Sequence, residues 1–243
     1  MAIDFNRSST INNLKFKESK QFTCGYLPLE TANARFIDPN QKLTNQIYSK
    51  LSEEGFRRSG DYIYIPSCRG CAACVPVRLR VKDFNMRRRH RRTLKLNQDI
   101  TILQVEPHFD STYFDLYKEY QIRRHDSGLT SISPSEYMNF FASEWCQTIF
   151  IEFRLKKKLV AVSVFDRLNN SLSAVYTFYK VDLPQRSLGQ LAILTQIDIA
   201  AQNGLSYLYL GYWIENSAKM KYKNDYSPIE YFLNGVWAEK HLL

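Results

Sequence analysis

The chain has 243 residues, 44% of them hydrophobic, and a formal net charge of +9. This length and composition allow one large core or two small ones. The positive charge favours a polyanionic partner, which can be a nucleic acid, an anionic membrane surface or an acidic substrate.

Membrane insertion and secretion are disfavoured by the same sequence. No stretch approaches the roughly 18 uninterrupted apolar residues of a membrane-spanning helix, and residues 1–20 lack the apolar segment of a signal peptide. Five cysteines without such a signal indicate a reducing compartment and not a disulfide scaffold. We therefore expect a cytoplasmic protein that does not bind membranes, and a nucleic-acid partner remains the leading interpretation.

The first hundred residues combine short strands and helices around a cysteine tract. We expect residues 1–20 to be a mobile lead-in. Leu43, Ile47 and Leu51 recur at helical spacing, and Gly55 ends that helix. Alternating residues predict strands over 62–65 and 75–81, with the cysteine tract as the loop between them. Asn85 is expected to cap a basic helix that extends to about residue 96.

From Ile100 onward the pattern changes to a strand-rich α/β sequence. A strand over 100–105 precedes a helix capped by Asp110, and Ser133-Pro134-Ser135-Glu136 forms a capping box at the start of another helix. Three strands are then expected over 148–155, 159–166 and 172–178, followed by a helix over 187–203 and a strand over 205–210. We expect a tightly packed N-terminal cysteine- and arginine-rich domain, residues 1–99, and a second domain, residues 100–243.

Cysteines and arginines form the most distinctive cluster of the N-terminal half. Cys68, Cys71 and Cys74 are spaced two residues apart, so they could hold zinc or an iron–sulfur cluster together with Cys24. Reduced thiols that merely pack are the alternative. The arginines that follow, at 87–89 and 91–92, are expected to bind phosphate groups.

The element order of the C-terminal half resembles the GNAT acyltransferase core. In that fold a turn at a helix N-terminus presents backbone N–H groups to the pyrophosphate of coenzyme A. Arg186 and Gly189 match the start of the turn motif, but Leu191 stands where the motif requires a small residue. The departure disfavours coenzyme A and leaves room for another phosphate-bearing acyl donor.

A second unusual segment lies near the C-terminus. Gly211, Tyr212 and Trp213 follow an apolar strand, and Lys221 and Lys223 then alternate with methionine and tyrosine. Aromatic rings can stack on bases while lysines contact phosphates, as single-stranded nucleic acid requires. The alternative is an aromatic cluster in the protein core.

Several motifs, in order, resemble the aminoacyl-tRNA–protein transferases of the N-degron pathway, and most closely their bacterial leucyltransferase branch. The motifs are Cys24–Pro28, Gly55–Gly60, Cys71–Arg78, Val175–Tyr179, Ser187–Gly189 and Tyr209–Ile214. The resemblance implies transfer of leucine from leucyl-tRNA to the α-amine of proteins beginning with Asp or Glu, which marks them for degradation. Arginyl transfer and a non-catalytic tRNA-binding module remain alternatives.

The resemblance also organises the candidate site residues. Aminolysis of an ester requires no cofactor, and Glu152, Asp166 and His125 are candidates for the base that collects the amine proton. Arginine binds carboxylates well, so Arg57, Arg58 and Arg78 are expected to bind the acidic acceptor. The residues expected to contact the aminoacyl-tRNA are Arg87, Arg88, Arg89, Arg91, Arg92, Tyr176, Arg186, Ser187, Gly189, Tyr212, Trp213, Lys221 and Lys223.

Overall fold

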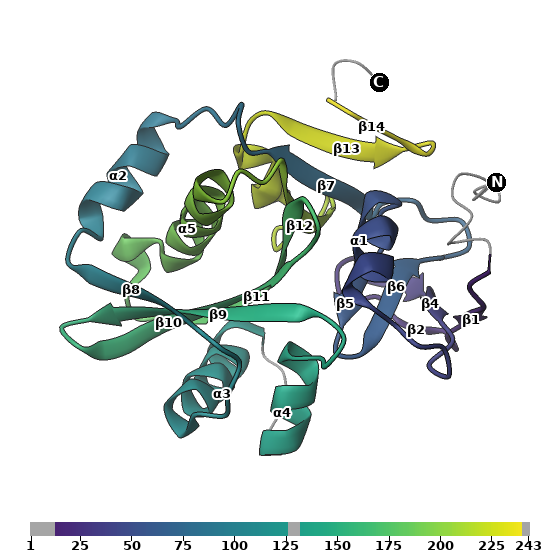
Figure 1. Ribbon diagram of the computed structural model, residues 1–243, viewed down its shortest axis with the longest axis horizontal. Helices are drawn as coiled ribbons and strands as arrows, with labels where there is room; N and C mark the ends of the chain where they lie inside the picture. Colours follow the sequence, from purple (N-terminus) through teal and green to yellow (C-terminus); the bar gives the residue numbers. More distant parts are fainter. Residues whose placement is uncertain (1–12, 126–131, 240–243) are drawn as a thin grey trace.

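A computed structural model describes residues 13–125 and 132–239, and one large sheet dominates it (Figure 1). Its eight strands lie in the order β14-β13-β7-β12-β11-β10-β9-β8. They are β7 (Val75–Arg80), β8 (Ile100–Val105), β9 (Gln147–Leu155), β10 (Lys158–Arg167), β11 (Ser171–Tyr179), β12 (Tyr207–Trp213), β13 (Ile229–Leu233) and β14 (Val236–Ala238). Neighbouring strands are antiparallel except β11 and β12, which are parallel.

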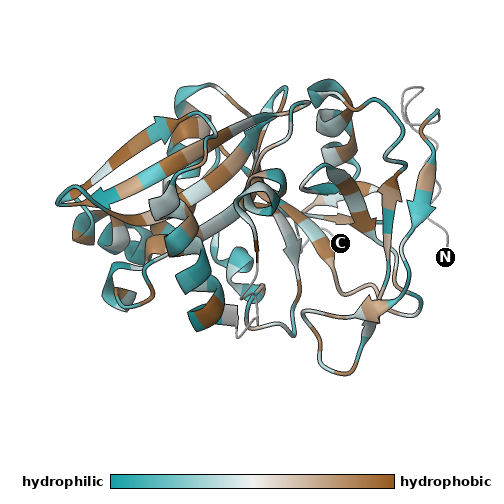
Figure 2. Ribbon diagram, turned by 90° about the horizontal axis from the view of Figure 1, so that it is seen from below, coloured by the Kyte–Doolittle hydropathy of each residue, from teal (hydrophilic) through white to brown (hydrophobic). Residues whose placement is uncertain are grey.

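Helices cover both faces of this sheet. Helices α2 (Arg88–Leu96) and α5 (Leu188–Gln202) lie on one face, and α3 (Ser111–His125) and α4 (Pro134–Phe141) lie on the other (Figure 1). Successive strand residues point to opposite faces, so Ile151 and Phe153 pack with α5 whereas Phe150 packs with α3 and α4. The alternation appears as brown and teal bands along the strands in Figure 2.

A smaller four-stranded sheet packs beside the large one. Its order is β1-β4-β6-β5, from β1 (Phe16–Glu18), β4 (Ala34–Ile37), β6 (Tyr62–Pro66) and β5 (Arg57–Ser59). Helix α1 (Asn45–Glu53) covers it, and its buried Tyr48 and Leu51 join a core with Phe56 and Ile63. A two-stranded ribbon, β2 (Phe22–Thr23) and β3 (Thr31–Ala32), and short 3₁₀ helices η1 (Pro184–Arg186) and η2 (Lys221–Asp225) complete the described chain.

The mixed α/β class and the GNAT-like order of three antiparallel strands, a helix and a parallel strand are confirmed. Three local expectations were wrong. Phe16–Glu18 forms β1 and does not belong to a lead-in, and the basic helix starts after Arg87 and not after Asn85. Strand β12 starts two residues later than expected, at Tyr207, and ends three residues later, at Trp213. The residues before position 13 lie outside the described chain.

The large sheet draws on both sides of the expected boundary at residue 100. Strand β7 lies between β12 and β13, although it comes from the first hundred residues. The division into domains of residues 1–99 and 100–243 stays a prediction, and it does not correspond to two separate sheets. Within the described residues, no helix is both long enough and apolar enough to cross a membrane.

Candidate functional site

Strands β11 and β12 separate in the middle of the large sheet. They pair only through Ser171–Ser173 and Tyr207–Tyr209. Beyond a register shift after Tyr209, β12 follows β7 while β11 continues along β10 to Tyr179. We call this divergence the fork, with Ala174–Tyr179 as one arm and Gly211–Trp213 as the other. Gly211, at φ +86°, adopts the left-handed conformation at the point of separation.

Two buried cations occupy the base of the fork. Arg57 extends from β5 and donates to Ser173 Oγ at 3.1 Å and to the carbonyl oxygen of Ala174. Lys223 extends from η2 and donates to the carbonyl oxygen of Tyr212 at 2.5 Å. A Cβ atom placed on Gly211 would lie 3.5 Å from Arg57 Nε and Nη2 and also from Lys223 Nζ.

Burial and the positive charge of Arg57 depress the pKa of Lys223 to about 7. Neither Arg57 nor Lys223 forms an ion pair with a carboxylate in the described chain. Other buried cations of this protein do have acidic partners, so the base of the fork is an uncompensated positive site.

A cavity of about 730 Å³ adjoins the fork. Its wall includes Tyr64, Cys74 and Tyr212, whose side chains are near the two cations: Arg57 acts electrostatically on both tyrosines, and Cys74 on Lys223. The Tyr212 hydroxyl lies 3.3 Å from the carbonyl oxygens of Gly55 and Tyr64, which fixes β12 to the smaller sheet. The cavity therefore leads from the smaller sheet and the cysteine segment toward the fork.

The N-terminus of α5 lies beside the other arm of the fork. A Cβ atom on Gly189 would approach Tyr179 Cε1 to 3.2 Å, so a larger residue here would require the Tyr179 ring to shift. Ser187 precedes the helix in a left-handed conformation, and Arg186 is held by Asp99 at 2.6 Å. The first N–H groups of a helix lack partners within the helix and attract anions. Arg186 thus shapes the turn, and because the Ser187 N–H donates to the carbonyl oxygen of Pro184, the backbone N–H groups of Leu188 and Gly189 are the ones that can meet a phosphate.

Helix α2 is attached directly to that turn. Thr93 donates to Gln190 at 2.5 Å, and Asn97 donates to the carbonyl oxygen of Arg186 at 2.8 Å. His90 stacks between Phe84 and Tyr226, with ring centroids 5.5 and 5.3 Å away. These contacts fix α2 relative to the α5 N-terminus.

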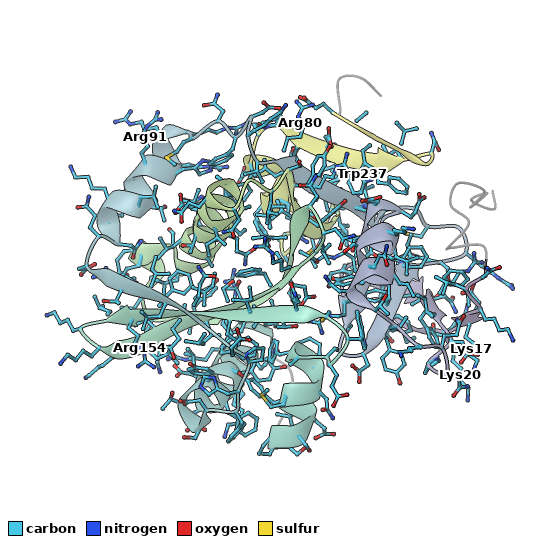
Figure 3. The ribbon with its side chains drawn as sticks, in the orientation of Figure 1. Lys17, Lys20, Arg80, Arg91, Arg154 and Trp237 are labelled. Carbon is cyan, nitrogen blue, oxygen red and sulfur yellow. The ribbon has the colours of Figure 1, made fainter. Side chains whose placement is uncertain are left out.

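The arginines in α2 and at its N-cap differ in exposure and in ion pairing. Arg87, Arg88, Arg91 and Arg92 are exposed, while Arg89 is paired with Asp225 at 2.8 Å. Arg91 projects outward from α2, at the opposite end of the molecule from Lys17 and Lys20 (Figure 3). A basic surface therefore lies next to the α5 N-terminus and the fork.

The other residues expected to contact tRNA are divided between surface and core. Lys221 is exposed, and Tyr176 is half-buried on β11 with its hydroxyl accepting from Gln121 at 2.9 Å. Trp213 is buried against Tyr231, with centroids 5.4 Å apart. Trp213 therefore packs in the core, where it offers no face for a base.

Of the three arginines expected to bind the acceptor, only Arg57 lies at the fork. Arg58 is completely buried and donates to both carboxylate oxygens of Asp166, at 2.7 and 2.8 Å. Arg78 pairs with Glu230 at 2.6 Å and stacks on the rings of Tyr207 and Trp237. Both arginines are held by contacts within the protein, so Arg57 is the remaining candidate of the three for binding the acidic acceptor.

The candidates for a general base have similar constraints. Asp166 is bound by Arg58 and by Thr148 at 2.7 Å. Glu152 accepts from Tyr113 and from Arg154, whose hydrogen bond lowers the pKa of this carboxyl. Neither carboxylate lies on an arm of the fork, so the structure offers no support for either as a base. The His125 side chain lies outside the described residues.

The cysteines come together without forming a ligand set. Cys24, Cys68, Cys71 and Cys74 all line the cavity and are all free thiols. Burial, together with the nearby thiols of Cys68, Cys24 and Cys71, raises the pKa of Cys74 to about 11. Among the described residues, no group of three or more His, Cys, Asp or Glu side chains is arranged to hold a metal ion. The arrangement shown does not fit zinc or an iron–sulfur cluster.

Sequence reasoning named Arg57, Lys223 and Tyr212 as site residues but did not identify the fork that brings them together. Ser173 and Tyr64 carry no motif signal, and the role of Gly211 depends on a register shift between two strands. Lys223 was recognised as a cation, but its burial could not be predicted. Lys221, two residues earlier in a similar sequence context, is exposed.

Comparisons with known proteins cover most of the chain. Residues 22–92 match the family described as arginine-tRNA-protein transferase, N terminus, and residues 112–233 match its C-terminus. The aspartate/glutamate leucyltransferase of Alcanivorax borkumensis is 46% identical over 231 residues, 95% of this chain and 96% of the relative. That of Pseudomonas aeruginosa is 46% identical over 226 residues, 93% of this chain and 96% of the relative.

Among solved structures, FemX has a TM-score of 0.46 at 7% identity, covering 83% of this chain and 80% of its own. This likeness is too distant to inform the chemistry. The two matched segments and the relatives at 46% identity are sufficient by themselves. The chain belongs to the arginine-tRNA-protein transferase family of aminoacyltransferases.

Proposed function

We propose that this protein transfers leucine from leucyl-tRNA to the N-terminal α-amine of proteins beginning with Asp or Glu, and so marks them for degradation by the N-degron pathway. The observation that carries the proposal is the 46% identity, over nearly the whole chain, to proteins named aspartate/glutamate leucyltransferase.

The reaction is an aminolysis and needs no redox step. The acceptor amine nitrogen attacks the ester carbonyl carbon of leucyl-tRNA, the new amide bond forms, and the ester C–O bond breaks. The proton lost by the amine balances the proton gained by the departing ribose oxygen. An α-amine with a pKa of about 8 is partly neutral near neutral pH, so orientation matters more than strong base catalysis.

The geometry supports a path for the donor. The exposed arginines of α2 can hold phosphates of the tRNA, and the adjacent N-terminus of α5 favours a phosphate near its 3′ end. From there the fork arm containing Tyr176 and Tyr179 leads into the sheet. The aminoacyl ester would lie between the arms.

The geometry also supports an acidic acceptor. Arg57 supplies a planar cationic group at the base of the fork, a type that binds carboxylates well. The adjoining cavity offers space for the first residues of a polypeptide. Donor and acceptor would then meet between β11 and β12.

A substrate matrix tests the proposal. The protein is given labelled leucyl-, arginyl- or phenylalanyl-tRNA with peptides beginning in Asp, Glu, Lys or Ala. We expect label to transfer from leucyl-tRNA to the Asp and Glu peptides alone. Transfer from arginyl-tRNA would instead support arginyl transfer, to which the family description points. Binding of tRNA without any labelled peptide would indicate a non-catalytic module.

A further inference from the structure

The base of the fork holds two cations for which no carboxylate of the described residues serves as a counter-ion. Arg57 is 9% exposed and the Lys223 residue 5%. Nitrogens of both side chains lie 3.5 Å from the position that a Cβ atom on Gly211 would occupy, so the two cationic groups are close neighbours. Burying one unpaired charge is unfavourable, and two like charges add mutual repulsion. Such an arrangement is expected where an anionic ligand completes the site.

The hydrogen-bonding groups that remain are suited to one small anion. Arg57 donates from Nη1 to Ser173 Oγ and from Nη2 to the carbonyl oxygen of Ala174. Its Nε has no protein acceptor among the described residues. Lys223 donates to Tyr212 and contacts the sulfur of Met220 at 3.1 Å, which leaves a further N–H. The free donors converge on Gly211, where any side chain would lie against both cations.

We propose that Arg57 and Lys223 together bind the side-chain carboxylate of the acceptor's first residue, and that Gly211 is the floor of this subsite. The inference rests on the proposed function and adds to it the second cation. An acidic side chain is a terminal group that can reach a buried position. A tRNA phosphate carries a ribose on each side, both of which would have to enter the base of the fork.

The subsite explains why the acceptor must be acidic. A peptide beginning with Asn or Gln has the same shape as the Asp or Glu peptide but would leave both cations uncompensated. Discrimination thus comes from completing a buried charge cluster and not from fitting a shape.

The test compares Lys223→Met with Lys219→Met, which removes an exposed lysine from the same segment. Binding of peptides beginning with Asp or Asn is measured by calorimetry without tRNA, and leucyl transfer is measured at saturating leucyl-tRNA. Lys223→Met is expected to weaken Asp-peptide binding about 30-fold or more, the usual effect of removing one partner of a buried charge pair. Leucyl-tRNA affinity and Asn-peptide binding should not change, and Lys219→Met should match the natural protein.

Arg57→Lys provides a second variant that keeps the charge but loses the planar edge. It should also weaken Asp-peptide binding while leaving the affinity for leucyl-tRNA intact. Loss of leucyl-tRNA affinity with unchanged peptide binding would overturn the subsite and assign the cations to a phosphate.

Failure of this inference is distinguishable from failure of the proposed function. If the natural protein transfers leucine to the Asp peptide and Lys223→Met binds and transfers equally well, the subsite is wrong and the function stands. If the natural protein transfers nothing, the function is wrong, and the peptide-binding measurements still decide whether Arg57 and Lys223 receive a carboxylate.

Discussion

At the scale of single residues, adjacent arginines have opposite roles. Side chains alternate along a strand, so Arg57 and Arg58 of β5 point to different faces. Arg58 meets Asp166 in the core, whereas Arg57 reaches the fork. Their motif could predict that arginines matter here. The sequence could not predict which one meets a carboxylate of the protein and which one is available to a ligand.

Arg58→Ala tests the structural role. It would leave Asp166 buried without its cation, and removal of one partner of a buried ion pair costs about 3–5 kcal/mol of unfolding free energy. Urea denaturation followed by circular dichroism measures the loss. Combining Arg58→Ala with Asp166→Leu should recover part of it, and additive losses in the double variant would contradict a coupled pair.

The lowered pKa of Lys223 predicts that acceptor binding depends on pH. Its pKa near 7 means that the free protein loses this positive charge as pH rises through neutrality, and a bound carboxylate should raise the pKa. The neighbouring Cys74 thiol, whose pKa burial raises to about 11, stays neutral over this range. Affinity for an Asp peptide should therefore fall about tenfold from about pH 6 to 8.

The matched Asn peptide is the control, because its α-amine titrates in the same range. The ratio of Asp to Asn affinity isolates the contribution of Lys223 from that of the amine. In Lys223→Met the ratio should not vary with pH. A ratio that stays constant in the natural protein would count against a titrating lysine in the subsite.

At the scale of elements, α2 is held rigidly on its inner side and is basic on its outer side. His90 and Thr93 anchor it, while Arg88 and Arg92 are exposed and make no ion pair within the described chain. The sequence predicted the helix and its charge. Its attachment to the α5 N-terminus depends on contacts with Gln190 and Arg186, about ninety residues away, which no local pattern reveals.

Replacing Arg88 and Arg92 by alanine should weaken leucyl-tRNA binding and flatten its salt dependence. Each lost phosphate contact lowers the slope of log affinity against log salt by about 0.7 to 0.9. Filter binding over a salt series measures the slope. Replacing Lys15 and Lys20, exposed residues flanking β1 at the other end of the molecule, should leave the slope unchanged. Equal effects of the two pairs would show that α2 has no special part in binding.

At the scale of the whole molecule, the two halves share one sheet. The strands of the second half could be predicted because β9, β10 and β11 are nine or ten residues long and rich in apolar and β-branched residues. The short strands β1 to β5 have two to four residues each and too little periodicity to be recognised. The position of β7 between β12 and β13 is a long-range pairing, so it could not be predicted from local sequence.

A fragment of residues 100–243 should therefore fail to fold on its own. It lacks β7, so β12 and β13 would each expose an unpaired edge at the centre of the sheet. We expect poor dispersion of its amide resonances and aggregation, and well-dispersed resonances from the whole chain. A folded, monomeric fragment would contradict this expectation and support an independent domain.

The central place of β7 has a consequence during synthesis. Val75–Arg80 leaves the ribosome long before Tyr207–Trp213 and Ile229–Leu233, the strands that flank it on both sides. Until translation is nearly complete, this apolar strand has no permanent neighbour, and nascent chains in that condition associate readily. We expect a newborn chain to depend on a ribosome-associated chaperone for most of its elongation, and the sheet to close as one of the last events of its production.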